Sequence, residues 1–235
     1  MTGVILQPTY IPWLGYFEMI DRADIFVIYD HVQFVKKTWH HRNRIKNKNG
    51  ELLLSIPTKN THLKTPIYDI CLSSEYEKVL VNHWLSIFYS YKNSKFFYKY
   101  SDSLHALYTN KYSTLMELTV EFIKYFCKQL GISIDIEYSS NLTLDGKLTN
   151  STEKVADICD QVNISTLYDA NGAKSIIDKT VLNKCGINVV FQKYKHPVYT
   201  QMFGDFIPYM SIIDLIMNEG DRSLDIVKSG SLFNI

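Results

Sequence analysis

Residues 3–29 read GVILQPTYIPWLGYFEMIDRADIFVIY, and this stretch decides the fold class. Residues 3–6 and 25–29 are short apolar runs rich in β-branched and aromatic side chains, which is typical of buried strands. Between them, Phe17, Ile20 and Ala23 recur at helical spacing, with charged residues on the opposite face. The stretch therefore predicts a strand, a helix and a strand of a parallel sheet, in which ligands bind at the carboxyl ends of the strands.

The rest of the sequence extends this pattern. Asn49-Gly50 between residues 44–46 and 51–57 predicts a hairpin, and apolar stripes over residues 75–130 predict helices, the last closed by Gly131. Residues 132–142 and 165–194 add further strands, and a helical tail is interrupted near Gly220. We predict a single α/β domain over residues 1–235, with a parallel-sheet Rossmann-like core and a helical subregion at 75–130.

Composition narrows the class of protein. The chain has 235 residues, 46% of them hydrophobic, and a formal net charge of +1, so no global field draws it to nucleic acid or to an acidic membrane. The cysteines are widely spaced, which argues against a zinc ribbon or a disulfide framework. No signal peptide and no apolar run of about 18 residues is present, so we expect a cytoplasmic protein without a membrane span.

Polar and aromatic residues gather where the first two predicted strands end, and in the hairpin that follows. Arginine suits phosphate or carboxylate, and the aromatic rings offer faces to a base or a sugar, so the cluster suits a nucleotide-like ligand. The alternative is a solvated hairpin with aromatic residues packed on its surface; nucleic acid is disfavoured by the balanced charge. The cluster comprises Gln7, Tyr10, Trp13, Tyr16, Asp30, His31, Gln33, Trp39, His40, His41, Arg42, Asn43, Arg44 and Lys46.

A second cluster lies near the end of the chain. Imidazole titrates near neutral pH, so His196 is the best candidate for a general base, although a structural role is the alternative. Asp214 and Asn218 are four residues apart and share a helix face, either as a binding pair or as a helix end capped by its own side chains. The other members of this cluster are Gln192, Tyr194, Tyr199 and Gln201.

Several standard sites are missing from the sequence. There is no phosphate-binding P-loop, no Gly-x-Gly-x-x-Gly, no His-Glu-x-x-His and no Gly-x-Ser-x-Gly. His40 and His41 would point to opposite faces of a strand and could not both bind one metal ion. The sequence therefore requires no metal.

Three separated motifs carry a family resemblance. They are QPTYIPWLGYFEMIDRADIFVIYDHVQFVKKTWHHRNRIK (residues 7–46), YKHPVYTQ (194–201) and SIIDLIMNEG (211–220). In their order and extent they resemble the WbqC-like family, which is found among genes for O-antigen, lipopolysaccharide and other surface-polysaccharide synthesis. The resemblance implies a cytoplasmic role in making or decorating a nucleotide-linked sugar. The recurring positions, in this chain, are Gln7, Pro8, Tyr10, Pro12, Trp13, Gly15, Tyr16, Gln33, Trp39, Arg42, Asn43, Lys46, Tyr194, His196, Pro197, Tyr199, Gln201, Ser211, Asp214, Asn218 and Gly220.

The layout of residues 3–29 is also similar to nucleotidylyltransferases and pantothenate synthetases. In those enzymes a His-x-Gly-His motif at the helix start holds ATP phosphates, whereas residues 13–16 here read Trp-Leu-Gly-Tyr. Both histidines are absent, so ATP use is kept as an alternative. A helix N-terminus after a proline-stiffened loop still favours an anionic ligand.

These observations lead us to expect a transferase that adds an acyl or aminoacyl group to the amine of a dTDP- or UDP-linked amino sugar. We assign His196 to proton removal and Gln7 and Asn43 to the oxyanion. Arg42, Arg44 and Lys46 are assigned to the diphosphate. The remaining substrate-binding candidates are Tyr10, Trp13, Tyr16, His31, Gln33, Trp39, His41, Tyr194, Tyr199, Gln201, Asp214 and Asn218.

Two alternatives stay open. One is an ATP-dependent ligase or nucleotidylyltransferase on the same scaffold, and the other is a non-catalytic sugar-nucleotide-binding protein of a polysaccharide assembly complex. The sequence identifies no cofactor. The expected transfer would use an acyl or aminoacyl donor, and ATP is the alternative. It leaves open whether the chains associate into a homo-oligomer.

Overall fold

Five short strands form one parallel sheet in the computed structural model, which describes residues 1–60, 62, 64–145, 148 and 150–232. Their order is β5-β2-β1-β6-β7, so the first strand of the chain is central. Gly3 pairs with Ile25, which confirms the predicted parallel strand pair. The strands are β1 (Thr2–Leu6), β2 (Ile25–Ile28), β5 (Asp135–Tyr138), β6 (Thr166–Asp169) and β7 (Asn188–Phe191).

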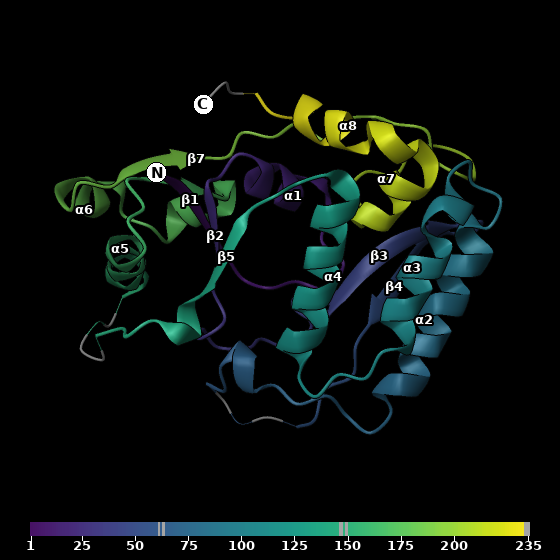
Figure 1. Ribbon diagram of the computed structural model, residues 1–235, viewed down its shortest axis with the longest axis horizontal. Coiled ribbons are helices and arrows are strands. Elements are labelled where there is room, and N and C mark those ends of the chain that lie inside the picture. The colour runs from purple at the N-terminus through teal and green to yellow at the C-terminus, as the bar shows by residue number, and fades with distance from the viewer. Residues whose placement is uncertain (61, 63, 146–147, 149, 233–235) are drawn as a thin grey trace.

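Alternate residues of the strands face two different helical layers (Figure 1). Ile5 and Val27 pack with α5 (Ser151–Gln161) and α6 (Lys179–Lys184) on one face. Val4 and Phe26 pack on the other face with α1 (Leu14–Asp21), whose residues are buried almost all round. Both faces of the sheet are therefore covered, as the continuous apolar strands predict.

Three helices fill the segment for which a helical subregion is predicted. They are α2 (Tyr76–Tyr91), α3 (Phe97–Thr109) and α4 (Leu115–Leu130). α4 begins where the Thr114 side chain accepts from the backbone N–H of Glu117, and it ends at Gly131, whose φ of 77° lies in the left-handed region.

The predicted hairpin is a separate two-stranded sheet, made of β3 (Arg42–Asn47) and β4 (Gly50–Ser55). His40 and His41 lie in the turn before β3 rather than within a strand. The chain ends in α7 (Ile212–Glu219) and α8 (Ser223–Ser229), with the predicted break at Gly220. Short 3-10 turns occupy Ile67–Asp69, Ser139–Asn141, Asn171–Ser175 and Gly220–Arg222.

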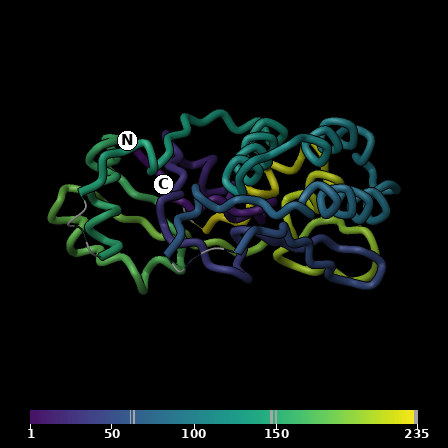
Figure 2. Tube along the Cα trace, turned by 90° about the horizontal axis from the view of Figure 1, so that it is seen from below, coloured from purple at the N-terminus to yellow at the C-terminus, as the bar shows by residue number. Residues whose placement is uncertain are grey.

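Segments far apart in the sequence meet beside the hairpin. Lys46 donates its Nζ to the carbonyl of Asp205 at 2.5 Å, and Arg44 donates to the carbonyl of Tyr209 at 3.4 Å. Figure 2 shows the hairpin and residues around 200–210 at the same end of the molecule. The hairpin thus joins the two sequence clusters that the motifs single out.

Candidate functional site

The loop from Gln7 to Trp13 leaves the carboxyl end of the central strand β1 and enters α1. Within it Ile11 has a φ of 40°, a left-handed conformation that a β-branched residue rarely adopts. Such strain persists only where the surroundings hold the backbone, and it concentrates at functional sites. The loop is therefore the first place to look for a ligand.

Asn43 of β3 holds this loop. Its Nδ2 donates to the carbonyls of Tyr10 at 3.2 Å and Ile11 at 2.9 Å, and its Oδ1 accepts from the backbone N–H of Arg44 at 2.8 Å. The side chain is buried. Both amide hydrogens of Asn43 are thus donated to the loop, and these hydrogen bonds offset the backbone strain at Ile11.

Backbone hydrogen bonds fix the loop from two further sides. The N–H of Tyr10 donates to the carbonyl of Trp39 at 3.2 Å, and the N–H of Ile212 at the start of α7 donates to the carbonyl of Pro12 at 2.8 Å. The loop is consequently tied to both of the sequence clusters.

The side chain of Tyr10 points into the core and is fully buried. Its hydroxyl lies 3.0 Å from Nδ1 of His83 and 3.0 Å from the hydroxyl of Tyr108. Burial lowers the pKa of His83 to about 4, so this imidazole is neutral at pH 7. The structure thus places Tyr10 as an internal anchor of the loop.

Trp13 lies back over the first turn of α1. A Cβ on Gly15 would meet the indole at 2.3 Å, so only glycine allows this position. The indole also contacts Tyr194 and Tyr209, with ring centroids 5.5 Å apart in each case. Gly15 therefore sets where the Trp13 ring lies.

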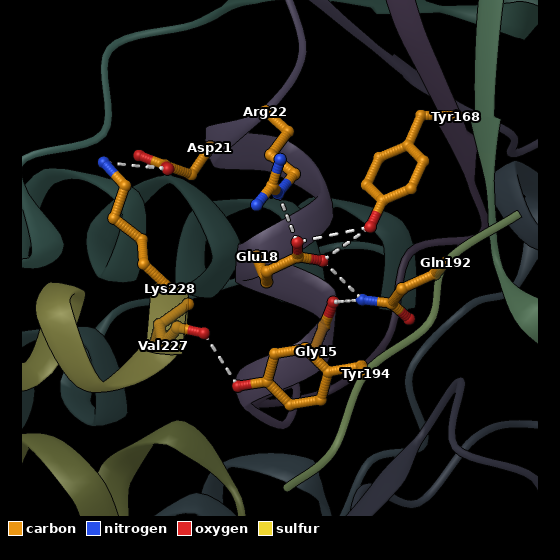
Figure 3. A network of polar contacts seen from close by, with 9 residues as sticks. All are labelled: Gly15, Glu18, Asp21, Arg22, Tyr168, Gln192, Tyr194, Val227 and Lys228. Atoms are coloured by element: carbon orange, nitrogen blue, oxygen red, sulfur yellow. Dashed lines mark hydrogen bonds and ion pairs between the residues drawn. The ribbon is translucent and has the colours of Figure 1, made fainter. Parts of the chain in front are cut away.

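A buried polar network lies beside α1 (Figure 3). Glu18, which is 1% exposed, contacts Arg22 at 2.5 Å and the hydroxyl of Tyr168 at 3.0 Å. Gln192 donates to Glu18 at 2.7 Å and to the carbonyl of Gly15 at 2.8 Å. The network joins β6 and β7 to the turn that carries Trp13.

A cavity of about 280 Å³ opens beside the loop. Its wall combines four large aromatic rings with one guanidinium and one amide. The lining residues are Thr9, Pro12, Trp13, Tyr16, Trp39, Asn43, Arg44 and Tyr209. We call this the aromatic cavity.

Arginine side chains surround Trp39 at the rim. The guanidinium carbon of Arg44 lies 5.4 Å from the Trp39 ring centroid and that of Arg42 lies 5.9 Å away. Arg44 pairs with Glu51 at 2.7 Å, whereas Arg42 donates to the carbonyl of Lys37. Nε of Arg44 is buried without a partner among the described residues, so it offers a donor at the cavity.

His196 packs against the far side of the Trp13 indole, with ring centroids 6.2 Å apart and planes 15° from parallel. Its Nδ1 donates to the carbonyl of Pro197 at 2.8 Å, which leaves Nε2 as the bare nitrogen. Nε2 is buried and has no partner in the described part of the chain. Burial lowers the pKa of His196, which favours the neutral base.

Gln7 and Gln33 line a second cavity, of about 560 Å³, on the other side of the loop. Oε1 of Gln7 accepts from Nε2 of His40 at 2.7 Å, and burial lowers the pKa of His40 to about 4. Thr9 and Tyr16 line both cavities. The two cavities are therefore neighbours across the loop.

His31 and His41 are engaged with the protein itself. Nδ1 of His31 donates to the Ser139 hydroxyl at 2.7 Å, while His41 donates to the Ile56 carbonyl at 2.9 Å and accepts from the Lys37 N–H at 3.0 Å. Burial lowers the pKa of both imidazoles.

Asp214 is the centre of a buried network. Its carboxylate accepts from Tyr91, Tyr199 and Gln201, each at 2.8 Å, and burial raises its pKa. Asn218 donates to the backbone carbonyl of Asp214 at 2.7 Å, which is a contact within the helix. Several predicted site residues line neither cavity: Tyr10, His31, His41, Arg42, Lys46, Tyr194, His196, Tyr199, Gln201, Asp214 and Asn218.

Four residues at this end of the sheet escaped the sequence analysis. Tyr209 and Thr9 line the aromatic cavity, Glu18 supports α1, and Asp169 lies at the end of β6. Glu18 carries a sequence signal, since it is an acidic residue between the apolar Phe17 and Met19. Asp169 is the last residue of a predicted strand, but the sequence does not reveal that this strand lies beside β1 in the sheet.

The sequence profile of the WbqC-like protein family matches residues 7–226. The chain belongs to this family. A relative from Mycobacterium tuberculosis (strain ATCC 25618 / H37Rv), the uncharacterized protein Rv1507c, is 31% identical over 232 residues, which cover 95% of this chain and 96% of the relative. No solved structure gives a significant match. Among the described residues of this family member, no helix has the length and apolar character needed to cross a bilayer.

Proposed function

We propose that the protein is a cytoplasmic transferase that adds an acyl or aminoacyl group to the amine of a nucleotide-linked sugar. The observation that carries this proposal is the aromatic cavity, which Trp13, Trp39 and Tyr209 line together with Arg44, whose guanidinium carbon lies 5.4 Å from the Trp39 ring centroid. Aromatic faces stack on a base or a sugar ring, and a guanidinium binds phosphate through two parallel hydrogen bonds. The cavity thus offers what a nucleotide needs.

The size of the aromatic cavity suits one ring and its phosphate. At about 280 Å³ it is slightly smaller than most small-molecule sites, which span roughly 300–1,000 Å³. Trp13 and Tyr209 also line a further cavity of about 460 Å³, which Lys193 and Asn171 border. An elongated nucleotide-linked sugar would extend from one space into the next.

The proposed reaction joins the amine nitrogen of the sugar to the carbonyl carbon of an activated acyl donor. The carbon–nitrogen bond forms, the bond to the leaving group breaks, and the leaving group departs with its electron pair. Nε2 of His196 is the proposed acceptor of the amine proton, because its tautomer leaves that nitrogen bare. Both amide hydrogens of Asn43 are in use, so the role of donor to the oxyanion rests on Gln7.

Tryptophan fluorescence tests the nucleotide site directly. Two of the three tryptophans line the aromatic cavity, and Trp84 stacks on His105 within the helical subregion. We expect dTDP and UDP to quench the fluorescence of the protein, and Trp39→Phe to reduce the amplitude. ADP is the comparison that would favour the ATP-dependent alternative.

Arg44→Lys should weaken nucleotide binding about ten- to a hundredfold, because an ammonium cannot reproduce the planar fork. The matched control is Arg222→Lys, since Arg222 is a surface arginine in an ion pair of 3.7 Å. The proposal is refuted if the fluorescence stays unchanged up to about 5 mM of each of the three nucleotides, a concentration far above the usual affinity range of such sites.

A further inference from the structure

The second cavity lies at the point where the strand order of the sheet reverses. From β1 the chain moves outward to β2 and β5, and it then returns to the other side of β1 as β6. Parallel α/β sheets bind ligands in the crevice at the carboxyl ends of such strands. With about 560 Å³, this switch-point cavity is larger than the aromatic cavity and falls within the range of small-molecule sites.

Asp169 supplies the charge of the switch-point cavity. It ends β6, it is 9% exposed, and its Oδ1 accepts from the N–H of Ala170 at 2.7 Å. In the described part of the chain no group donates to its Oδ2, and no lysine or arginine lines the cavity. Burial raises the pKa of Asp169 to about 6, so the carboxyl is still ionised at pH 7 to 8.

The walls around this carboxylate are largely apolar. They come from β1, from α5 and from the turn that follows β6, and they include Ile5, Leu6, Val155, Ile176 and Ile177. An ionised carboxylate against such walls is costly unless an opposite charge or several donors satisfy it. The chain provides one backbone donor to the Asp169 carboxylate, so a ligand would supply the opposite charge or the other donors.

The two neighbouring cavities therefore carry opposite charges. Arg44 lines the aromatic cavity, and Asp169 lines the switch-point cavity. Thr9 and Tyr16 form a common wall, so molecules bound in the two cavities would meet there. This arrangement fits two substrates, one anionic and one cationic.

We propose that the switch-point cavity binds a small molecule through a primary ammonium group that pairs with Asp169. The inference rests on the proposed function in one respect, because it identifies the amine-bearing partner in the transfer. The ammonium belongs either to an aminoacyl group or to the amino sugar, and the shared chemistry is the pairing of an ammonium with this carboxylate.

Titrations followed by NMR test the site with three probes. Isoamylamine and L-leucinamide represent an apolar amine and an aminoacyl group, and D-glucosamine represents an amino sugar; 3-methylbutanol is the uncharged isostere. The test variant is Asp169→Asn, which keeps the shape and an acceptor for Ala170. Asp225→Asn on α8 is the matched control, since this carboxylate is exposed.

We expect at least one amine to bind wild type and Asp225→Asn equally, and to bind Asp169→Asn about tenfold more weakly or worse. 3-Methylbutanol should not distinguish the three proteins. Tighter binding of L-leucinamide than of D-glucosamine assigns the ammonium to an aminoacyl group, and the reverse order assigns it to the amino sugar. Amine binding that survives Asp169→Asn unchanged, or the absence of amine binding to wild type, would overturn the inference.

Nucleotide quenching measured in the same samples keeps the two proposals apart. Binding of amines without binding of nucleotides would refute the proposed function and leave the ammonium site standing. Binding of nucleotides that persists in Asp169→Asn, together with no amine binding to wild type, would refute only the ammonium site.

Discussion

Replacement of Asn43 by leucine should destabilise the protein strongly, although the two side chains have similar sizes. The carbonyls of Tyr10 and Ile11 each lose a donor in a buried place. A buried polar group that is left without a partner costs about 1–3 kcal/mol, so we expect a loss of about 3 kcal/mol or more for the pair. For a chain of this length, that corresponds to a fall in melting temperature of about 6–12 °C.

The assay is urea unfolding followed by tryptophan fluorescence, with wild type, Asn43→Leu and Asn43→Asp. Asn43→Asp keeps the acceptor for Arg44 but turns an oxygen toward the two carbonyls, so we expect it to be at least as unstable. The control is Asn82→Ala on an exposed position of α2.

A loss below about 0.5 kcal/mol for both Asn43 variants, which is the size of a surface effect, would contradict this account of the loop. The nucleotide affinity of a folded Asn43→Leu protein adds a second measurement. It should fall, because the strained loop would relax away from its position over the aromatic cavity.

Three more predictions concern the same end of the sheet. Gly15→Ala should displace the Trp13 indole, because the added methyl group would lie 2.3 Å from it. The tryptophan emission spectrum of the folded, ligand-free variant should therefore differ from that of the wild type. Gln192→Leu should cost about 2–4 kcal/mol in urea unfolding, because it removes one donor from the buried Glu18 carboxylate and the side-chain donor from the Gly15 carbonyl. Burial raises the pKa of Asp169 from 3.8 to about 6, so its contribution to stability is present below pH 4 and is lost as the pH rises through 6. Asp169→Asn should therefore be more stable than wild type at pH 7 by up to about 3 kcal/mol, and unfolding curves at pH 4 should show that advantage disappear.

The elements of the fold were predictable because their signals are local. The apolar run of β1, the Asn49-Gly50 turn and the closing Gly131 each act within a few residues, and the structure has the expected element at each place. The three helices α2, α3 and α4 likewise lie within the predicted helical subregion.

The candidate site was predictable only in outline. Trp13 and Asn43 do meet at one cavity, because the hairpin that carries Asn43 is bonded to the loop that follows β1. The inward direction of Tyr10 goes with its contacts to His83 and Tyr108, which are distant in the sequence, so no local pattern reveals it. The position of Asp169 near β1 depends on the pairing of β1 with β6, which lies more than 150 residues further along the chain. The spacing of residues in the sequence does not reveal such a contact.

The anchoring of the loop by Ile212 sets the time at which the site can form during synthesis. Residues 7–13 leave the ribosome long before Ile212, to which one of their backbone hydrogen bonds is made. At about 5–20 residues per second, the loop waits roughly 10–40 s for that partner. The central strand waits almost as long for β6, with which Thr2 and Gly3 pair. A nascent chain therefore exposes these segments before the proposed ligand site can form around them.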